Sequence, residues 1–275
     1  MHRATFVLST GRCGTQWLAR KLDAAFKDSL RVSHEPLDNE YQPRLMLGRR
    51  TPHALDEKSC SVILRHVEEI ERGLEIKPYV ECGHPCWSTL PYLASRLGEK
   101  MQILHLIRHP IPTALSWLSR SAYLPPLLPH LREKVLLSAF DEGVTFTEYR
   151  DRWSSLLPFE KCVYYWAEVN AFGLNLEKRA TVPWLRVSFE NLFEGRGLES
   201  IERFLGVPDV PSIQGERAEI VDEHRSLIGE GLPDLDIWRS HPALLETAIR
   251  LGYDSSDLDH ESLGWRYAPF VRSPG

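Results

Sequence analysis

The chain has 275 residues, of which 43% are hydrophobic and 26% are charged, and its net charge is −5. This is the composition of an ordinary globular protein that is long enough to bury a substantial core. The negative net charge gives no support to nucleic acid or an anionic membrane as a partner. We find no long polar linker, low-complexity segment or internal repeat, so we expect a single domain over residues 1–275.

The apolar run near the N-terminus is too short for a signal peptide, and no stretch reaches about 18 apolar residues. The sequence therefore predicts a cytoplasmic protein that does not span a membrane. The five cysteines are odd in number and sparse, which argues against a disulfide framework. Cys82, His84 and Cys86 invite a metal site, but no second ligand pair accompanies them, so we expect two buried thiols and no metal.

Strand and helix patterns alternate along most of the chain. Short apolar runs predict strands, and apolar residues at three- and four-residue steps predict helices. Residues 37–55 have little periodicity and are expected to form a loop, and three prolines near 125 precede a region of about 130–178 that is expected to be mostly helical. The expected strands are 5–9, 31–33, 77–82, 102–107 and 182–187. One expected helix begins at Gly14, and the other expected helices are 57–72, 88–97, 113–120, 199–205 and 241–253.

This alternation predicts an α/β fold with a parallel central sheet and helices on both faces, carrying a mostly helical insertion around 120–178. Ligands of such sheets bind at the carboxyl ends of the strands. Four polar segments follow expected strands: the turn at 10–15, HEP at 34–36, CGHP at 82–85 and RHP at 108–110. We therefore expect these four segments to meet at one edge of the sheet.

The first of these segments, TGRCGTQW, is a glycine-rich turn between a strand and a helix. Such a turn directs backbone N–H groups and the positive end of the helix dipole at an anion, and glycine permits the backbone a close approach. The residues expected to surround the anion are Thr10, Gly11, Arg12, Cys13, Gly14, Thr15 and Gln16. The turn lacks the lysine of a nucleotide kinase, because Thr15 stands at that position.

A second anion site is indicated by RHPIPTALS. Arg108 ends an expected strand, and Ser116 follows eight residues later, about one turn into a helix that begins near two prolines. An arginine fork and a hydroxyl group suit a second phosphate.

These motifs together resemble those of the sulfotransferases that use 3′-phosphoadenosine-5′-phosphosulfate (PAPS). TGRCGTQWL is similar to the 5′-phosphosulfate loop of that family, with Cys13 and Gln16 in place of small hydroxyl residues. LIRHPIPTALSW is similar to the 3′-phosphate motif, with His109 and Pro112 as departures, and LRVSFENLF places Phe189 where the family has an aromatic residue near the adenine. The resemblance covers roughly residues 5–205 and implies a P-loop NTPase-like sulfotransferase fold, with PAPS as donor.

Sulfuryl transfer requires stabilisation of the leaving phosphate oxygen and a base for the acceptor. Arg12 and the loop amides are candidates for the first role, and no metal is required. Glu35, in a position where carbohydrate sulfotransferases have Glu-Pro, is the favoured base, and partial burial is expected to raise its pKa. His84, where small-molecule sulfotransferases have Lys-Thr-His, and His34 are the alternatives. Cys82 stands in place of the family's lysine.

The acceptor is expected to be a small molecule or carbohydrate-like compound with a hydroxyl or amine group, and the sequence does not indicate an oligomeric state. Two other functions remain open at this point. A P-loop phosphotransferase would use ATP and Mg²⁺, although the loop lysine is missing. A non-catalytic nucleotide-binding relative would keep the fold without the chemistry, in keeping with the departures at Cys13, Gln16, Cys82 and Pro112.

Overall fold

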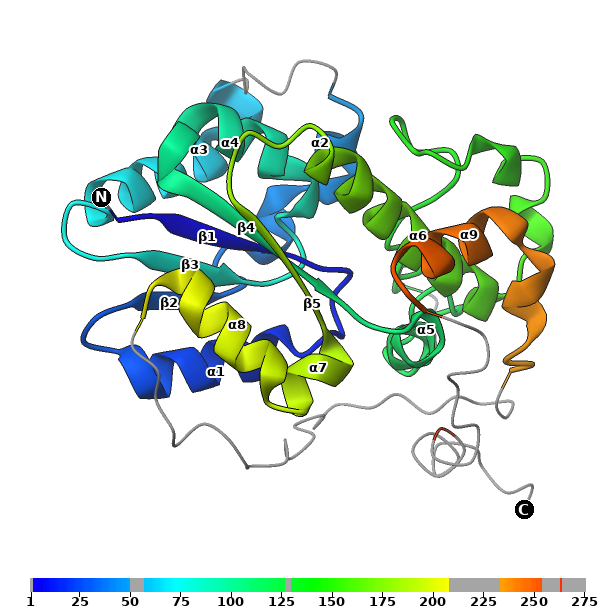
Figure 1. The fold of residues 1–275 in the computed structure, drawn as a ribbon. Coiled ribbons are helices and arrows are strands. Elements are labelled where there is room, and N and C mark those ends of the chain that lie inside the picture. The colour runs from blue at the N-terminus through cyan, green and yellow to red at the C-terminus, as the bar shows by residue number, and fades with distance from the viewer. Residues whose placement is uncertain (1, 50–56, 127–129, 208–232, 254–262, 264–275) are drawn as a thin grey trace. The chain divides into compact units, whose positions relative to one another are not determined.

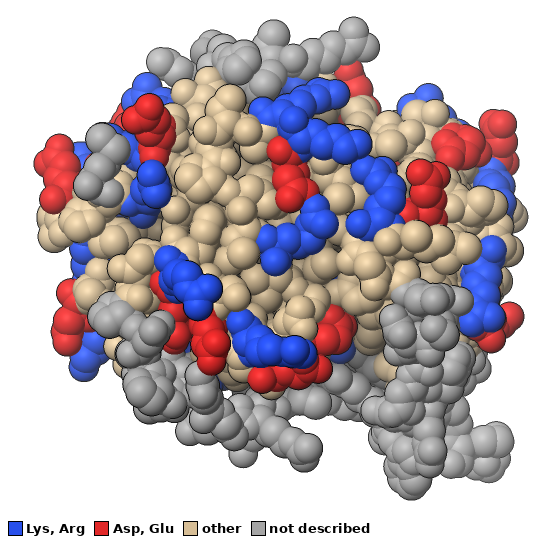
Figure 2. All heavy atoms as spheres, in the orientation of Figure 1, with Lys and Arg blue, Asp and Glu red and all other residues tan. Residues whose placement is uncertain are grey.

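The computed structural model describes residues 2–49, 57–126, 130–207, 233–253 and 263, which form two compact units. The first unit contains residues 1–107 and 172–219, and the second contains residues 108–171 and 220–275. Within the described residues, no helix is both long and apolar enough to cross a membrane. On the face drawn in Figure 2, Lys and Arg side chains are interspersed with Asp and Glu side chains.

The first unit is built on a five-stranded parallel sheet with the strand order β2-β3-β1-β4-β5 (Figure 1). The strands are β1 (Ala4–Leu8), β2 (Arg31–His34), β3 (Tyr79–Cys82), β4 (Met101–Ile107) and β5 (Trp184–Ser188). Burial on both faces explains why β1, β3 and β4 are almost continuously apolar. The five expected strands and the α/β fold class are thus confirmed.

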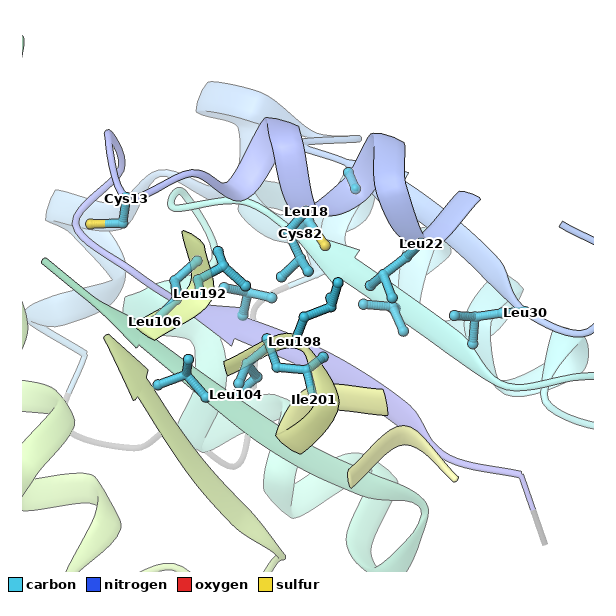
Figure 3. Close-up of a cluster of buried hydrophobic side chains, with 14 of the residues drawn as sticks. Cys13, Leu18, Leu22, Leu30, Cys82, Leu104, Leu106, Leu192, Leu198 and Ile201 are labelled. Atoms are coloured by element: carbon cyan, nitrogen blue, oxygen red, sulfur yellow. The ribbon is translucent and has the colours of Figure 1, made fainter. Parts of the chain in front are cut away.

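Helices cover both faces of this sheet (Figure 1). One face is covered by α1 (Thr15–Phe26), α7 (Phe189–Phe193) and α8 (Arg196–Leu205), and the other by α3 (Glu57–Gly73) and α4 (Leu90–Leu97). Figure 3 shows the core beneath α1 and α8, where Leu18, Leu22 and Ile201 pack on Leu104 and Leu106. Truncation of one such leucine to alanine typically costs about 2–5 kcal/mol of stability.

Short helices complete the connections of the first unit. The segment after β2, expected to be a loop, contains the 3₁₀ turn η1 (Asp38–Tyr41) and the helix α2 (Pro43–Leu47), and 50–56 lie outside the described residues. The segment after β3 contains η2 (Trp87–Thr89), against which α2 packs, and η3 (Gly98–Lys100) leads into β4. Pro43 at the first position of α2 fits a helix start, which explains why so short a helix forms there.

The second unit contains α5 (Pro110–Leu118), α9 (Pro242–Arg250) and most of α6 (Pro158–Glu177), whose last residues belong to the first unit. The prediction of a mostly helical insertion is correct only for α6. Between 121 and 157 the described chain forms turns and the short 3₁₀ helices η4 (Thr147–Tyr149) and η5 (Trp153–Ser155). A further 3₁₀ helix, η7 (Ile237–Ser240), precedes α9.

Side chains, not a helix, satisfy the backbone of this irregular segment. The Tyr123 hydroxyl accepts from the Leu137 amide at 2.9 Å and donates to its carbonyl at 2.6 Å. The buried Glu168 carboxylate accepts from the amides of Thr145 and Phe146 at 2.8 and 2.7 Å. A buried backbone that finds such partners does not need helical hydrogen bonds, and sequence periodicity does not reveal these partners.

Candidate active site

The turn between β1 and α1 has the backbone of an anion-binding loop. Gly11, Arg12 and Gly14 have positive φ angles of 72°, 59° and 86°. Gly14 is the N-cap residue of α1, and because it has no side chain, it does not cap the first amides of the helix. Since the positive end of the helix dipole and the first N–H groups of α1 lie here, this turn suits a phosphate or phosphosulfate group.

Several groups of the turn point inward and hold its shape. The Gly11 amide donates to Ser9 Oγ at 2.9 Å, so it is not one of the amides directed at an anion. Thr10 Oγ1 and Cys13 Sγ both contact the Gly11 carbonyl, at 3.0 and 3.1 Å. Cys13 is fully buried and belongs to the hydrophobic cluster of Figure 3. Cys13 can therefore meet an anion through its backbone only, and the thiol does not replace a hydroxyl contact.

Glu35 and His84 form a hydrogen-bonded pair at the ends of β2 and β3. Glu35 Oε1 lies 2.7 Å from His84 Nδ1 and 3.4 Å from the His84 amide. Because an ionised carboxylate only accepts hydrogen bonds, His84 Nδ1 carries the proton. In the neutral ring, Nε2 is then the unprotonated nitrogen. Both side chains keep about a fifth of their surface exposed, at 23% for Glu35 and 21% for His84.

The charge state of Glu35 differs from expectation. Burial acts to raise the pKa of Glu35, but the hydrogen bond and charge of His84 outweigh it, and the pKa falls to about 2 from an ordinary value of 4.5. The expectation that burial brings this carboxyl toward neutral pH is therefore wrong. A carboxylate with so low a pKa is a poor base and a good partner for a histidine.

His34 connects this pair to the anion-binding loop. Its Nε2 lies 3.4 Å from Thr15 Oγ1, at the start of α1, and 4.0 Å from Glu35 Oε1. Burial lowers the pKa of His34, which favours the neutral ring. The carboxyl ends of β1, β2 and β3 thus bring Thr15, His34, Glu35 and His84 together at one edge of the sheet, as expected from the sequence.

The position of Glu35 depends on a glycine that sequence reasoning did not single out. A Cβ atom at Gly83 would lie 2.7 Å from Glu35 Cγ and 3.3 Å from its Cα and N atoms. We expect Gly83→Ala to displace Glu35 and to lower turnover by about 10²-fold, because a displacement of about 1 Å has that effect in an active site. Turnover and nucleotide affinity measured together test this. Near-normal turnover would show that the pair tolerates the displacement.

An aromatic cluster lies beside Gly14. Phe189 begins α7 and packs against Phe193 with ring centroids 4.4 Å apart and planes tilted by 51°, and the ring of Phe193 lies 4.7 Å from that of Trp17. A Cβ atom at Gly14 would meet Phe193 at 3.3 Å and Phe189 at 3.4 Å. All three rings are partly exposed, so they can stack on a base. Phe193 was missed, although its four-residue spacing from Phe189 on one helix face indicates the pair.

Cys82 cannot take over the role of a cation. It is fully buried in the cluster of Figure 3, and burial raises the pKa of its thiol. Cys86 is buried as well, which confirms the expectation of two buried thiols. Within the described residues, no group of three His, Cys, Asp or Glu side chains could hold a metal ion.

Arg108 and Ser116 belong to the second unit. Arg108 directly follows β4, its carbonyl accepts from Trp166 Nε1 at 2.8 Å, and only 4% of the residue is exposed. Ser116 lies on α5 and is 3% exposed. His109 caps α5, since its Nδ1 accepts from the Ile111 amide at 3.2 Å. Through this cap His109 performs the role that Asn or Asp often has at a helix N-terminus.

No family model matches the chain, and no curated protein matches it in sequence. Solved structures do match it. The sulfotransferase domain from the curacin biosynthetic pathway superposes with a TM-score of 0.52 at 14% identity, over 92% of this chain and 99% of that chain. A sulfotransferase from Alicyclobacillus acidocaldarius gives 0.47 at 14%, over 93% and 98%. The domain from the Synechococcus PCC 7002 olefin synthase gives 0.46 at 16%, over 92% and 96%.

The curacin domain matches along nearly its whole length, and the five-stranded parallel sheet agrees with the α/β fold expected from the sequence. The chain has the sulfotransferase fold. This likeness concerns the fold, and the chemistry rests on the site residues themselves.

Proposed function

We propose that this protein is a sulfotransferase that moves a sulfuryl group from PAPS to a hydroxyl or amine acceptor. One observation carries the proposal: the anion-binding loop and the Glu35–His84 pair lie at the same edge of the sheet, joined by the Thr15–His34 contact at 3.4 Å. A phosphosulfate group held by the loop would then lie beside a histidine with an oriented ring.

In this proposal, different residues bind the phosphosulfate, the adenine and the 3′-phosphate of PAPS. The loop amides, Arg12 and the N-terminus of α1 would hold the 5′-phosphosulfate. Phe189, Phe193 and Trp17 would stack on the adenine, and Arg108 and Ser116 would bind the 3′-phosphate. PAPS supplies the activated sulfuryl group, and the protein contributes position and charge.

In this proposal His84 is the base and Glu35 orients it. The acceptor oxygen or nitrogen forms a bond to sulfur while its proton passes to His84 Nε2. The bond between sulfur and the phosphate oxygen breaks, and Arg12 meets the charge left on that oxygen. Glu35 keeps the proton on Nδ1 and stabilises the ring when it becomes positively charged. The acceptor would be a small molecule or carbohydrate-like compound.

The test is calorimetry with adenosine 3′,5′-bisphosphate, AMP and ATP-Mg²⁺. We expect the bisphosphate to bind at least about tenfold more tightly than AMP, because charge-assisted hydrogen bonds to phosphate contribute about 1.5–3 kcal/mol. Arg108→Ala should remove this preference and leave AMP affinity nearly unchanged. Arg203→Ala, at an exposed arginine of α8, is the control and should change neither affinity.

Equal affinities for the bisphosphate and AMP in the unmodified protein would contradict the proposal. Preferential binding of ATP-Mg²⁺ would favour a phosphotransferase instead. Transfer of labelled sulfate from PAPS to a panel of phenols, alcohols and amines would then identify the acceptor class.

A further inference from the structure

The buried carboxylate of Glu81, a residue of β3, lies at the centre of a hydrogen-bond network. Glu81 is only 1% exposed. Its Oε1 accepts from the Tyr41 hydroxyl at 2.5 Å, and its Oε2 lies 2.9 Å from the Tyr79 hydroxyl and 2.8 Å from His66 Nε2. A carboxylate that is removed from water in this way needs such partners to remain in place.

The partners come from three different parts of the first unit. Tyr79 is two residues away on the same strand, and His66 lies on α3. Tyr41 ends the η1 turn, which follows Glu35 by a few residues. Of the three contacts, the one to Tyr41 joins β3 to the segment that carries Glu35.

That segment has an unfavourable backbone. Glu35, Asp38 and Gln42 all have positive φ angles, of 47°, 43° and 46°, although none is glycine. Such conformations cost about 1–3 kcal/mol each and persist only where the surrounding structure holds them. The Glu35 amide is held at one end by the Cys82 carbonyl at 3.0 Å. The Tyr41 hydroxyl, buried with the rest of its side chain, holds the other end.

We propose that Glu81 is a positioning residue that acts through Tyr41 to keep Glu35 against His84. The inference rests on the proposed function of that pair. Glu81 contacts neither the loop nor the pair through its carboxylate. It holds the 35–42 segment in the strained backbone conformation that directs Glu35 Oε1 at His84 Nδ1. His84 lies three residues after Glu81, just beyond the end of β3.

Two matched variants test this, since Tyr41→Phe and Tyr79→Phe each remove one hydroxyl that contacts the same carboxylate. Of these two hydroxyls, only that of Tyr41 belongs to the 35–42 segment, whereas the Tyr79 hydroxyl also interacts with Ser33 on β2, before that segment. We expect Tyr41→Phe to lower kcat by about 10- to 100-fold with the KM for PAPS unchanged, and Tyr79→Phe to lower kcat by less than about threefold. Equal losses of kcat in the two variants would overturn the proposal. They would show that turnover depends on any disturbance of the Glu81 carboxylate and not on the hold that Tyr41 has on the 35–42 segment.

A second measurement does not depend on sulfuryl transfer. In ¹⁵N-labelled protein without added nucleotide, the proton on His84 Nδ1 should be protected from exchange by Glu35. We expect this signal to be lost in Tyr41→Phe and retained in Tyr79→Phe. Retention in both variants would overturn the positioning role. Because this readout requires no turnover, it remains decisive if the proposed activity itself fails.

Discussion

Replacing His84 by glutamine is expected to lower kcat by about 10²–10⁴-fold, which is the usual contribution of a general base. The reason is geometric and electrostatic. Glu35 accepts from Nδ1 at 2.7 Å, so the neutral ring carries its proton on Nδ1 and Nε2 is its basic nitrogen. Glutamine can donate a hydrogen bond to Glu35 but cannot take up the proton. The measurement is steady-state transfer from PAPS, together with calorimetry to show that bisphosphate affinity is retained.

Glu35→Gln is the informative comparison. It keeps the shape of the side chain and removes the charge that orients the ring, so we expect a smaller loss than in His84→Gln. Because the pKa of Glu35 is about 2, the carboxylate stays ionised and adds no step to the pH profile between about pH 5 and 8. Near-full turnover in His84→Gln with an inactive Glu35→Gln would make Glu35 the base.

Replacing Arg12 by alanine is expected to lower kcat by about 10²–10³-fold while changing bisphosphate affinity by less than about tenfold. Arg12 lies in the turn with a positive φ of 59°, between the two glycines that shape the anion site. It would meet charge that grows on the phosphate oxygen as the bond to sulfur breaks, so its contribution is larger in the transition state than in the bound ground state.

Two further variants show whether this loss is specific. Thr15→Ala removes a hydroxyl at the start of α1 and should mainly weaken binding. Arg72→Ala, at an exposed arginine of α3, should behave like the unmodified protein. If Arg12→Ala loses bisphosphate affinity and keeps its turnover at saturating PAPS, then Arg12 is only an anchor for the nucleotide.

The parallel sheet, and the edge of it at which the candidate site lies, could be predicted from the sequence. Strands buried on both faces are almost continuously apolar, and parallel strands place their carboxyl ends together, so motifs that follow strands can be placed without a structure. The loop at 10–15, Glu35 and His84 were predicted in this way. The helical content of 121–157 was overestimated, because Tyr123 and Glu168 satisfy the backbone there through contacts distant in sequence.

The directions of the side chains at the candidate site, and the groups that surround them, could not be predicted and are known from the folded structure. Cys13 and Cys82 lie in motifs, yet both thiols are packed in the hydrophobic core. The pKa of Glu35 is lowered because His84, 49 residues away, donates to it at 2.7 Å. Burial and hydrogen bonding set the charge of a carboxyl group, and both depend on neighbours that the chain brings together only when it folds.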